Sequence, residues 1–113
     1  PAPLSYASLE KGSRKVRAAL IGDDVRLTVL DGKILKIGRD PSRATALLKD
    51  PQVSGLHASL RLQNGLLHVR DEGSSAGTRL ESVRLEPGEW QELKEGDELE
   101  LGPIHLKVSL IDQ

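Results

Sequence analysis

Apolar and polar residues alternate along most of the chain from Val16 onward, which is the pattern of β-strands that bury one face. The alternation occurs in short runs at residues 16–20, 25–29, 35–37, 56–62, 67–69, 99–101 and 104–110. No stretch of about 12 residues shows the 3.6-residue period of an amphipathic helix. The pattern therefore predicts an all-β domain whose core is formed by the apolar side of each strand.

Turn sequences separate these runs. Asp31-Gly32 and Asn64-Gly65 each lie between two alternating segments. Both pairs predict type I′ hairpin turns, in which the two central residues have positive φ. Further turns are indicated at Pro87-Gly88, Glu95-Gly96-Asp97 and Gly102-Pro103. Short strands with turns about every ten residues predict an antiparallel β-sandwich.

The start of the chain differs from the rest. Residues 1–13 (PAPLSYASLEKGS) show no period and contain Pro, Ser and Gly, so we expect a linker or flexible arm there. Residues 14–113 are expected to form a single sandwich domain with one core. Because the first residue is Pro1 rather than Met, we expect the chain to be a domain excised from a longer protein.

Composition narrows the possible functions. Aromatic residues make up only 2% of the 113 residues, so the core is expected to be aliphatic, with Trp90 or Tyr6 included if either is buried. Trp90 is either a core residue or partly exposed, and its neighbours Glu89 and Gln91 favour inward packing. The net charge of -1 argues against nucleic-acid binding. The absence of Cys excludes disulfides and thiol catalysis and fits the cytoplasm or another reducing compartment. No apolar run approaches the roughly 18 residues that span a membrane, and three His without Cys predict no metal site.

Three polar motifs follow one another on loops between the predicted strands. They are Gly38-Arg39, Ser54-Gly55-Leu56-His57 and Gly73-Ser74-Ser75-Ala76-Gly77-Thr78. A planar, permanently charged guanidinium combined with small hydroxyl donors suits the binding of a phosphate group. The third motif lacks the Lys of a P-loop and precedes a strand, which argues against nucleotide binding. A Ser54–His57 catalytic dyad has no evident third group, so a binding module is favoured over an enzyme.

Over roughly residues 16–111 the chain resembles a forkhead-associated (FHA) domain, because Gly-Arg, Ser-x-x-His and a loop ending in Gly-Thr occur in the order and spacing of that family. The resemblance implies an antiparallel, FHA/SMAD-like β-sandwich of about eleven strands that binds phosphothreonine peptides through loops at one end. It assigns phosphate binding to Arg39, Ser54 and Ser75, with Ser74 replacing Ser75 if the loop register differs. It assigns support of the loops to Gly38, His57, Gly77 and Thr78.

The departures from the family pattern concern the peptide rather than the phosphate. Ala76 stands where the family has an Asn that holds the peptide backbone, and Gly55 replaces a residue that is often polar. A second family Asn aligns with Glu81, and the Gly after it aligns with Ser82. Compensation by Arg43 or Arg79 is possible, so the candidate peptide contacts are Gly55, Ala76, Arg43 and Arg79.

The favoured interpretation is a module without catalysis or cofactor that binds a phosphothreonine segment of a kinase substrate. Three charge-assisted hydrogen bonds supply on the order of 5 kcal/mol before ordering costs, whereas a dissociation constant of 10 μM needs about 7 kcal/mol. We therefore expect weak binding, with dissociation constants of tens to hundreds of μM. The alternative is a degenerate FHA scaffold that binds a protein surface without phosphate. No nucleic-acid or membrane partner is expected, and the oligomeric state is left open.

Overall fold

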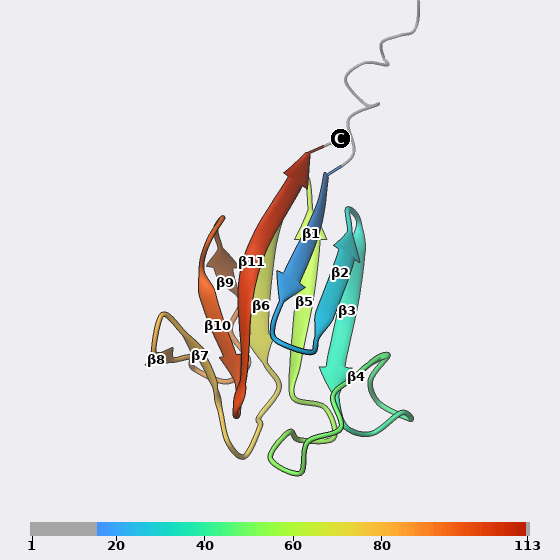
Figure 1. Cartoon of the computed structure of the whole chain (residues 1–113), viewed down its shortest axis with the longest axis vertical. Helices are drawn as coiled ribbons and strands as arrows, with labels where there is room; N and C mark the ends of the chain where they lie inside the picture. Colours follow the sequence, from blue (N-terminus) through green and yellow to red (C-terminus); the bar gives the residue numbers. More distant parts are fainter. Residues whose placement is uncertain (1–15, 113) are drawn as a thin grey trace, which may run out of the picture.

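The computed structural model describes residues 16–112, which form eleven strands in two sheets (Figure 1). The strands are β1 (Val16–Ile21), β2 (Arg26–Leu30), β3 (Lys33–Gly38), β4 (Ala46–Leu47), β5 (Ala58–Gln63), β6 (Leu66–Asp71), β7 (Thr78–Leu80), β8 (Val83–Arg84), β9 (Gln91–Leu93), β10 (Glu98–Leu101) and β11 (Ile104–Asp112). Residues 16–112 contain no helix. The all-β prediction is thus confirmed, whereas the expected arm at residues 1–13 lies outside the described residues.

The two sheets stack face to face as a sandwich (Figure 1). One sheet has six strands in the order β2-β1-β11-β10-β7-β8, and the other has five in the order β4-β3-β5-β6-β9. Every strand pair in them is antiparallel except β3 with β4. Val16 pairs with Asp112, so β1 begins where β11 ends, at one end of the sandwich.

The core between the sheets is aliphatic, as the composition predicts. Its largest fully buried apolar side chains are Leu20, Val29, Ile37, Val53, Leu60, Leu62, Leu67, Leu93, Leu99, Leu101 and Leu106. Burying one such side chain contributes roughly 1.5–3 kcal/mol. The alternation in each strand places these residues on the inner face and leaves the polar residues outside. This core fixes the end of β3, the start of β5 and the end of β6, and it thereby anchors the loops attached at those points.

The two predicted hairpin turns have different outcomes. Asn64 and Gly65 have φ of 54° and 79°, and they connect the paired strands β5 and β6, which confirms that hairpin. The hairpin predicted at Asp31-Gly32 is wrong, because β2 and β3 lie in different sheets and only Gly32 has positive φ. The amide of Gly32 donates to Leu62 O, and the Asp31 carboxylate accepts from the Gly65 amide. These bonds attach the turn to the β5–β6 hairpin at the point where the chain crosses from one sheet to the other.

Of the two positions left open for Trp90, the structure shows the partly exposed one and not the core. It is half-buried directly before β9, and the guanidinium carbons of Arg61 and Arg70 lie 4.3 and 4.4 Å from its ring centroid. Residue 90 shares its side of the strand with Glu92, whereas the buried Leu93 lies on the other side. Cation–π attraction to these two arginines stabilises the indole on the outer face of the five-stranded sheet. The polar residues on either side of Trp90 do not predict this position.

Candidate functional site

Three loops meet at the end of the sandwich opposite the Val16–Asp112 pair (Figure 1). They follow β3, precede β5 and follow β6, and each contains one of the three motifs. The Arg39 amide donates to Ser54 O at 3.0 Å, and the Asp40 amide donates to Gly55 O at 3.1 Å. A side chain at Gly38 would collide with the Gly55 carbonyl oxygen. Glycine at position 38 therefore allows the first two loops to pack backbone against backbone.

The three predicted phosphate ligands line one hollow. Its volume is about 290 Å³, and its lining residues are Arg39, Pro51, Gln52, Val53, Ser54, Ser75 and Ala76. Arg39 is exposed, and its Nε donates to the Val53 carbonyl oxygen at 2.9 Å. This bond fixes the arginine by its inner nitrogen while the two terminal nitrogens extend beyond it. A preorganised guanidinium of this kind loses less entropy when it binds an anion.

Ser54 and Ser75 are joined to each other across the hollow. The Ser75 amide donates to Ser54 Oγ at 3.0 Å. Within residues 16–112 the Ser54 hydroxyl donates to no protein acceptor, so its proton is free for a ligand in the hollow. Ser75 itself is exposed. The arrangement offers two hydroxyl donors beside the Arg39 guanidinium, which suits a tetrahedral oxyanion.

His57 connects two of the loops from a fully buried position. Its Nδ1 accepts from the Ser54 amide at 3.1 Å, and its Nε2 lies 2.9 Å from the Gly77 carbonyl oxygen. Because a carbonyl only accepts, Nε2 carries the proton and the neutral ring uses both nitrogens. Both nitrogens are thus engaged with backbone atoms, and neither is available to activate the Ser54 hydroxyl. His57 therefore connects the two loops instead of acting as a base toward Ser54.

Asp71 organises the third loop, and sequence reasoning missed it. Its side chain is 1% exposed and accepts hydrogen bonds from the Gly73 and Ser74 amides and from the hydroxyls of Ser74 and Thr78. Burial raises the pKa of Asp71, but these hydrogen bonds outweigh it and hold that pKa below its usual range. The detectable signal was an Asp two residues before Gly73, since Asp commonly accepts a hydrogen bond from the backbone amide two residues on.

The same network decides between Ser74 and Ser75. Ser74 is buried, donates its hydroxyl to Asp71, and accepts from the Gly77 amide at 3.0 Å. It therefore serves the loop itself, and the structure puts Ser75 rather than Ser74 at the hollow. Thr78 begins β7, and its hydroxyl also donates a hydrogen bond to the Asp71 carboxylate.

The two candidate compensating arginines occupy different places. Arg43 lies against Gly55, where a side chain would collide with its guanidinium, and its Nε is 3.2 Å from an Asp40 carboxylate oxygen. Hydrogen bonds from the backbone and hydroxyl of Ser42, together with Arg43, hold the pKa of Asp40 below its usual range. Arg79 does not line the hollow. It pairs in register with Glu100 in the six-stranded sheet.

Glu81 and Ser82 form the turn between β7 and β8, with φ of 50° and 69°. The Glu81 carboxylate accepts from the Glu98 amide at 2.6 Å, and its own amide donates to Glu98 O at 2.9 Å. Glu81 thus ties the β7–β8 turn to β10. This tie is structural and lies outside the residues that line the hollow.

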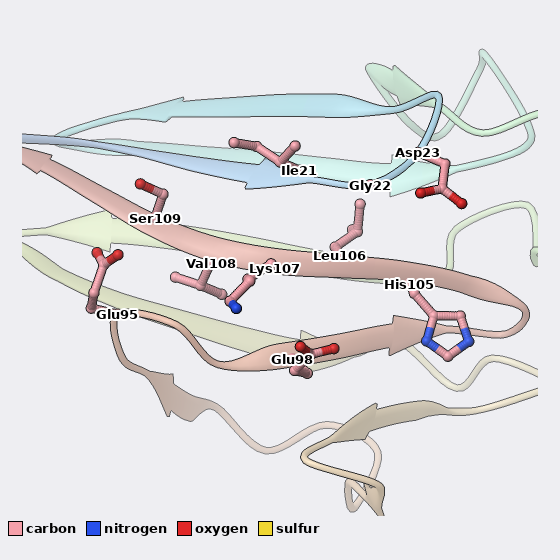
Figure 2. A pocket seen from close by; sticks show the side chains of 10 residues that line it. All are labelled: Ile21, Gly22, Asp23, Glu95, Glu98, His105, Leu106, Lys107, Val108 and Ser109. Carbon is pink, nitrogen blue, oxygen red and sulfur yellow. The ribbon is translucent and has the colours of Figure 1, made fainter.

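A larger hollow of about 570 Å³ lies on the outer face of the six-stranded sheet (Figure 2). Figure 2 shows His105 and Lys107 on β11, Glu98 at the start of β10, and Glu95 on the segment before it. Charges of both signs and no loop motif residue line it, so it offers no concentrated site for an anion. In the part of the chain that the structure covers, no three potential metal ligands cluster, and no helix has the length and apolar character needed to cross a membrane.

The FHA domain family model matches residues 35–102, which include all three motif loops. The chain belongs to the FHA domain family. Glycogen accumulation regulator GarA of Mycobacterium tuberculosis is 38% identical over 78 residues, covering 69% of this chain and 46% of that protein. The chain spans about half the length of the curated relatives it matches.

Solved structures agree with this assignment. The solution structure of an FHA domain from an Arabidopsis thaliana protein is 26% identical, with a TM-score of 0.73, and the match covers 86% of each chain. An FHA domain studied for its phosphothreonine-dependent interactions is 25% identical, with a TM-score of 0.69, over 84% of this chain and 95% of that one. The FHA sandwich expected from the sequence is thus confirmed.

Proposed function

We propose that this FHA domain is a non-catalytic module that binds phosphothreonine-containing segments of proteins. The phosphate would occupy the hollow lined by Arg39, Ser54 and Ser75. The observation that carries the proposal is the meeting of one anchored guanidinium and two hydroxyl groups in that hollow. A similar FHA domain with phosphothreonine-dependent interactions supports the choice of ligand. The absence of Cys supports a reducing compartment such as the cytoplasm as its place of action.

The site is suited to a dianion because its donors are fixed before the ligand arrives. Phosphothreonine carries about -1.5 to -2 charge and three acceptor oxygens. Arg39 is held by Val53, and the two serine loops are joined by His57 and by the Ser75–Ser54 bond. Preorganisation lowers the ordering cost, although only three ligand side chains contribute. We therefore keep the expectation of weak binding, in the range of tens to hundreds of μM.

The test is a calorimetric titration of the whole chain with a degenerate phosphothreonine peptide pool and with its unphosphorylated twin. Binding is expected for the phosphorylated pool only, and Arg39→Ala should abolish it. Lys33→Ala, which removes a positive charge at the start of β3, is the matched control and should bind as wild type does. Equal binding of both pools, or an Arg39→Ala variant that binds normally, would refute the proposal.

A phosphate-independent scaffold is the second candidate function. It is favoured by Ala76, which lines the hollow without any polar side-chain atom, and by Gly55, which has none to offer either. Such a scaffold would bind the surface of a protein partner through the same loops. Under this alternative, Arg39→Ala leaves partner binding intact, so the variant separates the two functions.

A further inference from the structure

Two arginines lie flat against glycines in two of the phosphate loops. Arg43 covers Gly55, the residue after Ser54, and a side chain there would collide with its guanidinium. Arg84, on the edge strand β8, covers Gly77, the residue after Ala76, and a Cβ at that glycine would lie 2.9 Å from the Arg84 guanidinium carbon. Ser54 and Ala76 both line the hollow. One guanidinium therefore lies against each of two loops, at the glycine that follows a residue lining the hollow, although neither arginine lines the hollow itself.

The charge of these two arginines is only partly neutralised. Arg43 contacts Asp40 through Nε, at 3.2 Å, and its side chain remains 60% exposed. Arg84 is exposed, and no carboxylate of residues 16–112 forms an ion pair with it. Its register partner is Arg79. Like charges placed directly opposite each other destabilise a strand pair, so an anion bound beside Arg84 would relieve an unfavourable arrangement.

We propose that Arg43 and Arg84 make this site selective for phosphothreonine segments that carry acidic side chains next to the phosphorylated residue. The proposal rests on the proposed function and extends it from the phosphate to its neighbours. A guanidinium offers a rigid fork of donors that matches a carboxylate. The two glycines matter because their lack of a side chain lets each arginine lie against the backbone of a loop that lines the hollow.

The experiment compares one phosphothreonine peptide in three versions, with Asp, Ala or Lys at the positions flanking the phosphothreonine. Each is titrated calorimetrically into the whole chain at low ionic strength. The wild type is expected to bind the Asp version most tightly and the Lys version most weakly. Each exposed ion pair is worth roughly a 1.4- to 5-fold change in affinity. The preference should fade in roughly 1 M salt, where the screening length is about 3 Å.

Variants identify the residues responsible. Arg43→Gln and Arg84→Gln keep most of the side-chain length and should each reduce the ratio of affinities for the Asp and Ala peptides, whereas Lys33→Ala should leave it unchanged. Equal affinity for the three peptides, with phosphate and Arg39 still required, would overturn the acidic preference and leave the proposed function standing. No binding of any of the three would overturn both. A preference that persists in both glutamine variants would remove Arg43 and Arg84 from the explanation.

Discussion

Buried polar residues hold the candidate site together at the scale of single residues. The ring nitrogens of His57 bridge the Ser54 amide and the Gly77 carbonyl, and the Asp71 carboxylate gathers the donors of the third loop. Both side chains are almost completely buried. Every buried side-chain nitrogen or oxygen within residues 16–112 has a hydrogen-bond partner, which matters because an unpaired buried donor or acceptor costs about 1–3 kcal/mol. The proposed phosphate ligands Arg39, Ser54 and Ser75 depend on these buried residues for their positions.

Asp71 should make stability dependent on pH in the acid range. Its pKa in the folded state is lowered, so its contribution is fully present above the ordinary pKa of about 3.9 and is lost as the pH falls through the lower folded value. Asp71→Asn should cost roughly 2–4 kcal/mol at neutral pH, and the difference from wild type should shrink below about pH 4. Urea unfolding across pH measures this. Asp24→Asn, at an exposed site, is the control, and a pH-independent difference would contradict the prediction.

Replacing His57 tests the brace between the loops. His57→Ala leaves a cavity and deprives the Ser54 amide of its acceptor, while the Gly77 carbonyl keeps only its bond from the Gly102 amide. We therefore expect a loss of about 2–4 kcal/mol in the free energy of unfolding. The matched control is His68→Ala on the outer face of β6, which should cost less than about 1 kcal/mol. Chemical denaturation measures both variants. A similar loss of unfolding free energy in the two variants would show that the hydrogen bonds of His57 between the loops do not stabilise the domain.

At the scale of elements, the β7–β8 turn is unusual because non-glycine residues occupy both positions of positive φ. Glu81 and Ser82 have φ of 50° and 69°, a region that costs an L-residue roughly 1–2 kcal/mol. Glu81 is compensated in part by its bonds to Glu98. Ser82 has no hydrogen bond from its side chain to any residue in the range 16–112. The strain on this turn is therefore concentrated at Ser82.

Ser82→Gly should stabilise the domain by about 1 kcal/mol, because glycine adopts positive φ without a steric cost. Ser109→Gly is the matched control, since residue 109 lies inside β11, where glycine is unfavourable by roughly 0.5–1 kcal/mol. Urea midpoints of the two variants are expected to move in opposite directions. A destabilised Ser82→Gly variant would mean that the serine contributes something beyond its backbone conformation.

Local pattern predicted the elements better than their connections. Alternation located the main strands, and Asn64-Gly65 correctly predicted a hairpin, because turn chemistry is decided within a few residues. Asp31-Gly32 has similar turn chemistry, but contacts with Leu62 and Gly65, distant in sequence, direct it between the sheets. The position of Trp90 could not be decided, and the contact of Arg84 was missed, for the same reason. Their partners come from other strands or loops, and no short window of sequence contains both sides of such a contact.

At the scale of the whole molecule, the sandwich separates the start of β1 and the end of β11 from its candidate binding loops. Val16 and Asp112 pair at one end, and the three motif loops lie at the other (Figure 1). The net charge of only -1 means that attraction of a phosphopeptide must come from local arginines rather than from the field of the whole domain. The larger hollow on the outer sheet face lies apart from these loops and has mixed charge (Figure 2).

The most direct test of the central claim is to map phosphopeptide binding by amide chemical shifts on the isotopically labelled chain. With a phosphothreonine peptide pool, we expect the largest shifts at the Arg39, Ser54 and Ser75 amides, and none beyond baseline with the unphosphorylated pool. The amides of Lys107 and His105, beside the larger hollow, should stay in place. Shifts that cluster at Lys107 and His105, or that are the same for both pools, would contradict a phosphate-reading site in the motif loops.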